Sequence, residues 1–246
     1  MKDIIFELCA ESLEAARAAQ NGGADRVELC AALSSGGLTP SVALTTAATA
    51  ALSIPVYLLI RPRSGDFVYS PDEFMRMRRE IEEAREVGAA GVVLGILHPD
   101  GRVDVERSRE LVELAYPMKT TFHRAFDATP DLFQALEDVI WTGADCLLTS
   151  GGKPNVQAGA DAIARLQEKA SGRLHIMAGG GLTLENLADV VYRTGVSCLH
   201  GSLTNWRRNG SGAESAAGVN TASLEADLRE AIRLFRHQLS MREFAV

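Results

Sequence analysis

The sequence predicts an α/β fold of the TIM-type (β/α)8 barrel class, with all 246 residues in a single domain. Eight short apolar runs typical of strands alternate with eight helical stretches, which is the number and rhythm that such a barrel needs. The joints between helices and the strands that follow repeat Gly-Ala or a close variant. A doubly wound parallel sheet is the alternative topology. The even spacing of eight units, and the lack of a GxGxxG motif after the first strand, favour the barrel.

The apolar runs and the helical periodicity define the expected elements. The predicted strands are Ile4–Cys9, Arg26–Cys30, Val56–Ile60, Gly91–Leu97, Lys119–His123, Cys146–Ser150, Leu174–Ala178 and Val196–His200. The predicted helices are Ser12–Gln20, Ser41–Ala51, Pro71–Val87, Val105–Ala115, Asp131–Thr142, Val156–Ala170, Leu184–Tyr192 and Ala222–Leu239.

The repeated joints follow the ends of helices. They read Gly22-Gly23-Ala24-Asp25, Gly88-Ala89-Ala90, Gly143-Ala144-Asp145 and Thr194-Gly195-Val196. Glycine ends a helix readily because it adopts the left-handed conformation without strain. The joints therefore belong to the face of the barrel opposite the functional face, and their repetition reflects the fold. Ser70-Pro71 and Thr129-Pro130-Asp131 mark two helix starts.

One segment interrupts the rhythm. Residues 204–220 are rich in Gly, Ser, Ala and Asn and contain Arg207-Arg208. Because they follow the eighth strand, they predict a long mobile loop on the functional face. A loosely ordered insertion with no role is the alternative.

Composition excludes several classes of protein. The net charge of −7 argues against a nucleic-acid partner, which calls for a basic surface. No apolar run approaches the roughly 20 residues of a membrane span, and the N-terminus does not read as a secretory signal. We therefore expect a cytoplasmic protein whose four cysteines are reduced thiols.

The word Glu-Leu-Cys-Ala occurs twice, as residues 7–10 and again as residues 28–31. Each copy closes a predicted strand, and residues two apart in a strand share a face. Glu7 and Cys9 should therefore point the same way, and so should Glu28 and Cys30. Two neighbouring strands would then each carry a carboxylate and a thiol at their C-terminal ends. The simpler interpretation is that successive units of one fold need similar strands.

The alternation of side chains along the strands also predicts a ring of polar side chains inside the barrel. In a (β/α)8 barrel the functional site lies at the C-terminal ends of the strands. Val56, Leu58 and Ile60 should face the helices, which places Arg61 on the inner face. The same reasoning places His123 and His200 there, so the predicted inner ring is Glu7, Glu28, Arg61, His123 and His200. Arg61 is expected to meet a carboxylate in bidentate fashion. A polar plug that only closes the barrel mouth is the alternative.

Two glycine segments predict anion binding. Ser150-Gly151-Gly152 and Gly179-Gly180-Gly181 follow the sixth and seventh strands, and their backbone N–H groups are unobstructed by side chains. Barrels often hold phosphate in this region. Glycines after strands are also needed simply to turn the chain.

The paired thiols allow a metal site. Two metal–thiolate bonds of about 2.3 Å place the sulfur atoms no more than ~4.6 Å apart, and adjacent strands are ~4.8 Å apart. Cys9 and Cys30 can then reach one ion if the barrel stagger allows. Thiolate and imidazole ligands suit Cu(I). Cysteine as a small buried hydrophobe is the alternative, preferred for Cys146 and Cys198.

These motifs together resemble the CutC family, named for copper homeostasis. The resemblance covers residues 1 to about 205 and rests on the repeated Glu-Leu-Cys-Ala and on four segments: Ile60-Arg61-Pro62-Arg63-Ser64-Gly65-Asp66-Phe67, Phe122-His123-Arg124-Ala125-Phe126-Asp127, Leu148-Thr149-Ser150-Gly151-Gly152 and Met177-Ala178-Gly179-Gly180-Gly181. The resemblance implies a cytoplasmic TIM-type barrel, a homodimer and copper binding, with no established reaction. Copper sites that involve cysteine would match Cys9 and Cys30.

Three functions remain open at this stage. The first is a copper-binding protein with Cu(I) at Cys9 and Cys30 and with His123 or His200 as further ligands. The second is an enzyme of unassigned reaction on a small anionic or phosphorylated metabolite. Glu7 or Glu28 would be its general base and His123 its general acid, and Arg61 and the glycine segments would hold the anion. The third is a dimeric scaffold without a site.

Overall fold

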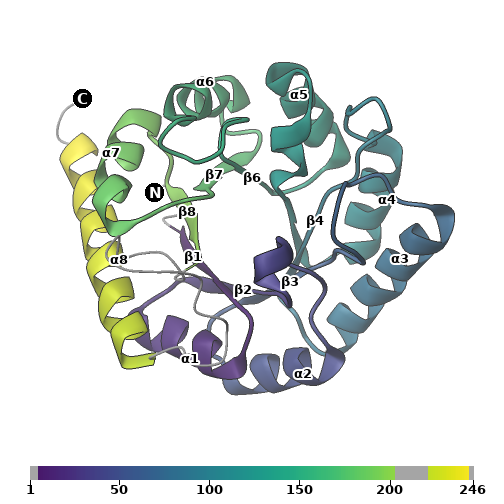
Figure 1. Cartoon of the computed structure of the whole chain (residues 1–246), viewed down its shortest axis with the longest axis horizontal. Helices are drawn as coiled ribbons and strands as arrows, with labels where there is room; N and C mark the ends of the chain where they lie inside the picture. Colours follow the sequence, from purple (N-terminus) through teal and green to yellow (C-terminus); the bar gives the residue numbers. More distant parts are fainter. Residues whose placement is uncertain (1–4, 203–220, 244–246) are drawn as a thin grey trace.

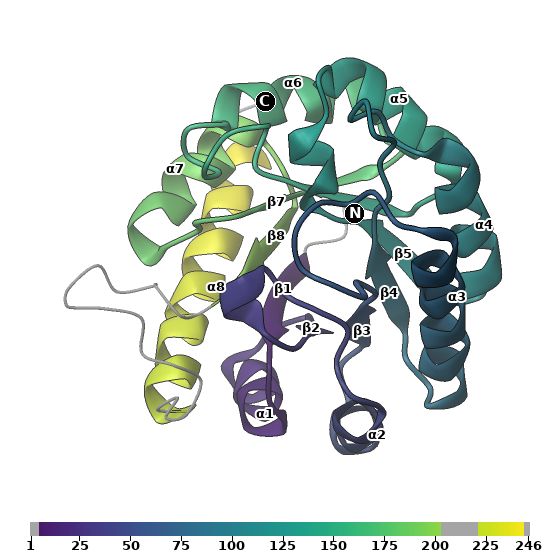
Figure 2. The ribbon, with the colours of Figure 1, turned by 45° about the vertical axis from the view of Figure 1, so that its right-hand side comes forward.

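The computed structural model describes residues 5–202 and 221–243. Eight parallel strands close into a barrel in chain order, from β1 to β8 and back to β1. Figure 1 shows the helices as a ring around the strands, and Figure 2 shows the same arrangement turned by 45° about the vertical axis. The predicted (β/α)8 barrel is therefore confirmed. The expected loop at 204–220 lies outside the described residues.

The elements have the following bounds. The strands are β1 (Ile5–Ala10), β2 (Arg26–Leu29), β3 (Val56–Leu59), β4 (Gly91–Leu94), β5 (Lys119–Phe122), β6 (Cys146–Thr149), β7 (His175–Gly179) and β8 (Cys198–Gly201). The helices are α1 (Leu13–Gly22), α2 (Val42–Ala51), α3 (Pro71–Glu86), α4 (Val105–Ala115), α5 (Leu132–Thr142), α6 (Ala160–Ala170), α7 (Leu184–Thr194) and α8 (Thr221–Glu243). Two short 3-10 helices are η1 (Leu33–Ser35) and η2 (Arg124–Ala128).

The helix ends follow the local signals in the sequence. Helix α3 begins with a full capping box, in which the side chains of Ser70 and Glu73 each bind the other's backbone N–H. Helices α1, α5 and α7 end at glycines in the left-handed conformation, Gly23, Gly143 and Gly195. The predicted role of the repeated joints is confirmed at these three helices.

The aspartates of two joints accept hydrogen bonds from the starts of neighbouring strands. Asp25 accepts a hydrogen bond from the backbone N–H of Phe6 at the start of β1. Asp145 accepts one from Thr120 at the start of β5. In both cases the residue after Gly-Ala satisfies an N–H group on the strand before it, so the repeated joint fastens each helix end to the sheet.

One predicted helix begins later than expected. Helix α6 starts at Ala160 rather than at Val156. The chain before it turns back on the loop after β6, and Gly159 lies so close to this loop that a Cβ atom there would be 1.8 Å from the carbonyl oxygen of Ser150. Helical periodicity does not reveal such a contact, because the contact depends on a segment nine residues away.

The outer and inner faces of the strands pack against different side chains. Leu58 and Ile60 pack outward with Met77 and Ile81 of α3, as the alternation in β3 predicts. On the inner side, Cys9 and Cys30 cluster with apolar side chains of β3 and β4: Tyr57, Leu59 and Val93. A second inner cluster contains Cys146, Leu148, Met177 and Cys198. All four cysteines are buried, and none of them forms a disulfide.

Candidate functional site

The interior of the barrel contains a buried ion pair. Glu7 is completely buried, and its Oε2 lies 2.5 Å from Nε of Arg26. The guanidinium of Arg26 also stacks over the ring of Tyr57, at 4.2 Å from the centroid. Burial alone would raise the pKa of Glu7, but Arg26 and His200 outweigh it and lower the pKa to about 2. Glu7 is therefore ionised throughout the physiological range.

His200 at the end of β8 is the second partner of Glu7. Its Nδ1 lies 2.7 Å from Oε1 of Glu7 and 3.4 Å from Oε2 of Glu28. Burial lowers the pKa of His200, but the hydrogen bond with Glu7 and the charges of both glutamates outweigh it and raise the pKa above its usual value. Because Glu7 is ionised, Nδ1 of His200 donates the hydrogen bond to it, and Nε2 is the ring nitrogen that Glu7 does not hold.

Glu28 lies in a different environment from Glu7. It is 5% exposed, and its Oε2 has no hydrogen-bond partner among the described residues. Burial raises the pKa of Glu28 to about 7; the Glu7 charge adds to the rise, while His200 and Arg26 oppose it. The two glutamates of the repeated word therefore differ, with one permanently charged and the other able to exchange a proton near neutral pH.

The two thiols of the repeated word lie in contact. Sγ of Cys9 and Sγ of Cys30 are 3.3 Å apart. The hydrogen bond between the thiols, burial and the charge of Glu28 raise the pKa of Cys9 well above its usual value. The thiol of Cys9 is thus protonated unless a cation stabilises its thiolate.

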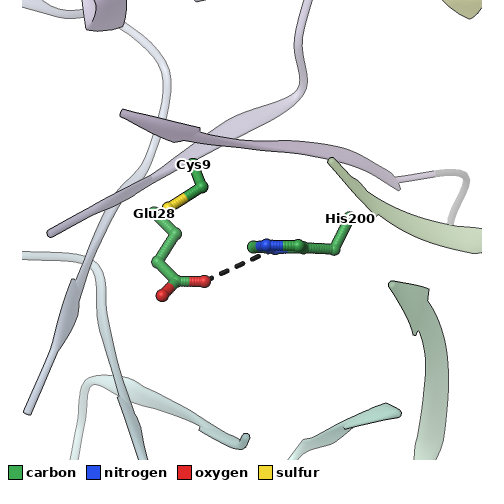
Figure 3. Close-up of side chains that lie close together, drawn as sticks. All are labelled: Cys9, Glu28 and His200. Carbon is green, nitrogen blue, oxygen red and sulfur yellow. Dashed lines mark ion pairs between the residues drawn. The ribbon is translucent and has the colours of Figure 1, made fainter. Parts of the chain in front are cut away.

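Three side chains meet at metal-binding distances. Ligand atoms of Cys9, Glu28 and His200 all lie within 4.8 Å of one another, and Figure 3 shows them converging from β1, β2 and β8. Cys30 adjoins this group through Cys9. The three come together because the β1–β2 ladder pairs Cys9 with Glu28, and the β1–β8 ladder pairs Glu7 with His200. We name Cys9, Cys30, Glu28 and His200 the thiol site.

Arg61 does not meet a carboxylate, so this prediction is wrong. Its guanidinium donates instead to backbone carbonyls, those of Ser35, Gly36 and Gly37 through Nη1 and that of Gly65 through Nη2. Residues 35–37 fold back from η1 toward β3, and Arg61 fastens them to the loop after β3. The cation that pairs with Glu7 is Arg26, which is not among the residues of the predicted inner ring. Arg26 is two residues before Glu28 on the same face of β2, so alternation alone would have found it.

His123 lies apart from the thiol site. Its ring packs against Phe67, with centroids 5.0 Å apart, and its Nδ1 accepts a hydrogen bond from the N–H of Ala125. Burial and the charge of Arg61 lower the pKa of His123 to about 3, so the imidazole is neutral. With Nδ1 as an acceptor, the hydrogen of this neutral ring is on Nε2. Its Nδ1 is engaged by Ala125, and His123 is not among the side chains whose ligand atoms lie together, so we leave it out of the thiol site.

The glycine segment after β6 already binds an anion from within the chain. The carboxylate of Asp127 accepts hydrogen bonds from the N–H groups of Ser150 and Gly152 and from the hydroxyls of Thr149 and Ser150. Arg124 also binds this carboxylate, through Nε at 2.9 Å. The predicted donors of Ser150 and Gly152 thus face Asp127, while Gly151 donates to Thr149 Oγ1.

The segment after β7 lies against Arg124. A Cβ atom at Gly180 would come within 2.8 Å of Cζ of Arg124, so glycine is needed there for the guanidinium to fit. The carbonyl of Gly180 accepts a hydrogen bond from Val156, and that of Gly181 accepts one from Asn186. Gly179, the last residue of β7, packs beside His200. Anion binding at Gly179, Gly180 and Gly181 remains a prediction.

Among the described residues, no helix is long and apolar enough to cross a membrane. This agrees with the sequence, in which no apolar run approaches the length of a span.

Comparison with known proteins identifies relatives of this chain. The model of the CutC family matches residues 4–205. The "family protein CutC" of Chromobacterium violaceum is 44% identical over 244 residues, which cover 96% of this chain and 98% of the relative. The protein of the same name from Vibrio vulnificus is 45% identical over 196 residues, which cover 79% of this chain and 78% of the relative.

Solved structures give the same result. The crystal structure of the "Putative Copper Homeostasis Protein CutC" from Streptococcus agalactiae superimposes with a TM-score of 0.77 at 34% identity, and covers 81% of this chain and 98% of that chain. Thiamine phosphate pyrophosphorylase from Pyrococcus furiosus matches with a TM-score of 0.63 at 14% identity, covering 96% of this chain and 97% of that chain. This second likeness shows the fold alone. The family model and the relatives together show that this chain belongs to the CutC family.

Proposed function

We propose that this protein binds Cu(I) at the thiol site and that its function is in copper homeostasis. The observation that carries the proposal is the contact between the thiols of Cys9 and Cys30, at 3.3 Å, beside Glu28 and His200. Thiolate sulfur with imidazole nitrogen is the ligand set that favours Cu(I) over harder cations. The name of the Streptococcus agalactiae protein supports the same function.

The geometry of the thiols fits such an ion. Metal–sulfur bonds of about 2.3 Å give a sulfur–sulfur distance of about 4 Å in a trigonal site and ~4.6 Å in a linear one. The thiols are 3.3 Å apart, so they need to separate by only about 1 Å. Small rotations about the side-chain bonds supply this, and the trigonal arrangement needs the smaller change.

His200 is the third ligand that we propose. Glu7 accepts the hydrogen bond from Nδ1, which fixes the ring and directs Nε2 away from the carboxylate. A carboxylate that orients a histidine in this way is the usual support for a metal-bound imidazole. Arg26 in turn holds Glu7 ionised. The buried ion pair at the barrel centre would thus act as the support of the metal site.

Anaerobic titration with Cu(I) against a competing chelator tests the proposal. We expect the wild-type protein to bind one Cu(I), and we expect Cys9→Ser/Cys30→Ser to lose this binding. Cys146→Ala is the matched control, because Cys146 is also a buried thiol inside the barrel but belongs to the other inner cluster. Binding that survives in the double variant, or that is lost equally in Cys146→Ala, would contradict the proposal.

A second candidate is acid–base catalysis on a small anionic or phosphorylated metabolite. It is supported by the hydrogen bond between His200 and Glu7, with Glu28 lying 3.4 Å from the same ring nitrogen. Such a carboxylate–histidine pair is a common proton-transfer device. A thermal-shift screen of phosphorylated and carboxylated metabolites tests it: a ligand whose stabilising effect disappears in His200→Asn supports catalysis at this site, and a flat response contradicts it.

The likeness to the CutC family also supports a proposal for the location and the oligomeric state of the protein. We propose a cytoplasmic homodimer, since reduced thiols are needed for Cu(I) and CutC-type proteins are expected to pair. Sedimentation of the purified protein tests the dimer, and fractionation of cells tests the location.

A further inference from the structure

A short loop lies against the two thiols of the thiol site. Residues 31–38, which we name the cover loop, come directly after Cys30 at the end of β2 and include η1. In Figure 1, η1 is the short dark purple helix inside the ring of outer helices, next to β2 and β3. Leu33 of η1 packs against the inner cluster that contains Cys9 and Cys30. The cover loop therefore contacts the thiol pair at the C-terminal ends of its strands.

The backbone of the cover loop is also close to this cluster. A Cβ atom at Gly37 would be 2.7 Å from Cδ2 of Leu59 and 3.8 Å from Cβ of Cys30, so glycine is needed for this approach. Cys30 is 0% exposed and Cys9 is 8% exposed. An ion that arrives with its own ligands cannot reach thiols buried to this degree. A part of the protein has to move before both sulfur atoms can bind it.

The geometry of the cover loop allows it to move as one piece. Two backbone hydrogen bonds between Ala31 and Leu38, of 2.9 and 2.7 Å, join its ends. Between these ends, residues 34–36 are exposed, and no residue of η1 is buried. Ala32 has a φ of 51°, in the left-handed region that residues with a Cβ atom rarely adopt. Joined ends and an exposed tip are typical of a compact surface loop that opens as a unit.

Two charged side chains hold the cover loop in place. The guanidinium of Arg61 donates to the carbonyls of Gly36 and Gly37, each at 3.0 Å. The carboxylate of Glu11 accepts a hydrogen bond of 2.6 Å from the backbone N–H of Leu33. Arg61 follows β3 and Glu11 follows β1, so both belong to the barrel frame and not to the loop. Hydrogen bonds with one charged partner are stronger than neutral ones, and water can replace them when the loop opens.

We propose that the cover loop is a gate over the thiol site and that Arg61 and Glu11 hold this gate closed. Opening breaks their hydrogen bonds to the loop, moves Leu33 away from the inner cluster and exposes Sγ of Cys9 and Cys30. The two side chains therefore set the rates at which a metal ion enters and leaves, whereas the ligand atoms set its affinity. The role in metal entry rests on the proposed copper binding, but opening itself is a property of the metal-free protein.

Alkylation of the metal-free protein with N-ethylmaleimide tests the gate without copper, with mass spectrometry to identify the modified cysteine. We expect slow modification of Cys9 and Cys30 in the wild-type protein and at least tenfold faster modification in Glu11→Ala, which loses a hydrogen bond to a charged acceptor. Glu14→Ala is the matched control, because Glu14 is an exposed glutamate in the first turn of α1, and its rate should equal that of wild type. Cys146, in the other inner cluster, is the internal reference for global unfolding, and its rate should be the same in all variants.

Arg61→Lys is the second variant. It keeps the positive charge but lacks the planar group that reaches the carbonyls of Gly36 and Gly37 together, so it should also accelerate modification. Stopped-flow exchange of Cu(I) with a chelator then measures the gate in the loaded protein. In both variants we expect Cu(I) uptake and release to become faster by the same factor, with the dissociation constant unchanged.

Equal modification rates in wild type, Glu11→Ala and Arg61→Lys would overturn the gate. A rise at Cys146 by the same factor as at Cys9 would also overturn it, because the whole barrel would then be opening. If Cu(I) does not bind but alkylation responds as expected, the copper proposal fails and the gate is supported. If Cu(I) binds to wild type and both variants at the same rates, copper binding is supported and the gate is contradicted.

Discussion

Cys9 is paired with Glu28, and not with Cys30, in the ladder between β1 and β2. The two copies of Glu-Leu-Cys-Ala are therefore staggered by two residues across the barrel wall. Glu7 faces Arg26 instead of Glu28, and this offset separates the two carboxylates. Because of this stagger, Glu7 of the first copy forms an ion pair with Arg26, whereas Glu28 of the second copy lies beside the thiol of Cys9.

The Glu7–Arg26 pair gives the first prediction. Arg26→Met should lower the free energy of unfolding by about 3–5 kcal/mol, because it leaves the charge of Glu7 buried without its main partner. The second variant, Glu7→Gln/Arg26→Met, should recover most of the loss, since it removes both charges. Urea denaturation at neutral pH measures both. A double variant no more stable than Arg26→Met alone would show that the pair acts through packing and not through charge.

The raised pKa of Glu28 gives the second prediction. Its pKa is 4.5 as a free group and about 7 in the folded protein, because burial disfavours the charged form. The folded state therefore binds this proton more tightly, and the resulting stability is present below about pH 4.5 and is lost as the pH rises through 7. Glu28→Gln should match wild type at about pH 5 and exceed its stability above pH 8, by up to roughly 3 kcal/mol.

Urea midpoints of the two proteins at the two pH values check this. Glu80→Gln, on α3 and outside the barrel, is the comparison variant. Equal differences between Glu28→Gln and wild type at both pH values would contradict the account.

The lowered pKa of His123 gives the third prediction, in which the protein loses stability as the pH falls and not as it rises. Its pKa is 6.5 as a free group and about 3 in the folded protein, so folding favours the neutral ring. The resulting stability is present above about pH 6.5 and is lost as the pH falls toward 3. Between pH 7 and about pH 4.5, wild type should lose roughly 3 kcal/mol that His123→Gln does not lose. Denaturation curves at both pH values measure this, and His175→Gln, at an exposed position, should behave like wild type.

The loop after β6 gives the fourth prediction. Asp127 accepts hydrogen bonds from Thr149, Ser150, Gly152 and Arg124. Asp127→Ala should cost about 2–4 kcal/mol, because several of these bonds involve a charged acceptor. The same change should make residues 150–156 more susceptible to limited proteolysis. Asp138→Ala, which removes one exposed hydrogen bond on α5, should have little effect. Unchanged proteolysis in Asp127→Ala would contradict this role.

Much of the fold could be predicted from the sequence, because its signals are local. Glycine caps, helix periodicity and alternation in β3 each act over a few residues, and they place the elements in order. Alternation also placed Glu7, Glu28 and His200 at the same end of the barrel, and the structure brings them together.

The errors concern residues whose partners are distant in the sequence. The sequence predicts a carboxylate as the partner of Arg61, but the turn at residues 35–37 places three backbone carbonyls at its guanidinium instead. The donors of Ser150 and Gly152 read as an open anion site, but Asp127 occupies them from the neighbouring strand end. The stagger between β1 and β2 is likewise a property of barrel closure, which no short segment encodes.

The measurement that tests the central claim most directly is X-ray absorption at the copper edge on protein loaded with one Cu(I) under anaerobic conditions. The account predicts two sulfur ligands at about 2.3 Å and one nitrogen ligand, with the sulfur signal lost in Cys9→Ser/Cys30→Ser and the nitrogen signal lost in His200→Asn. A copper environment made only of nitrogen and oxygen, or one that is the same in wild type and the cysteine variant, would contradict binding at the thiol site.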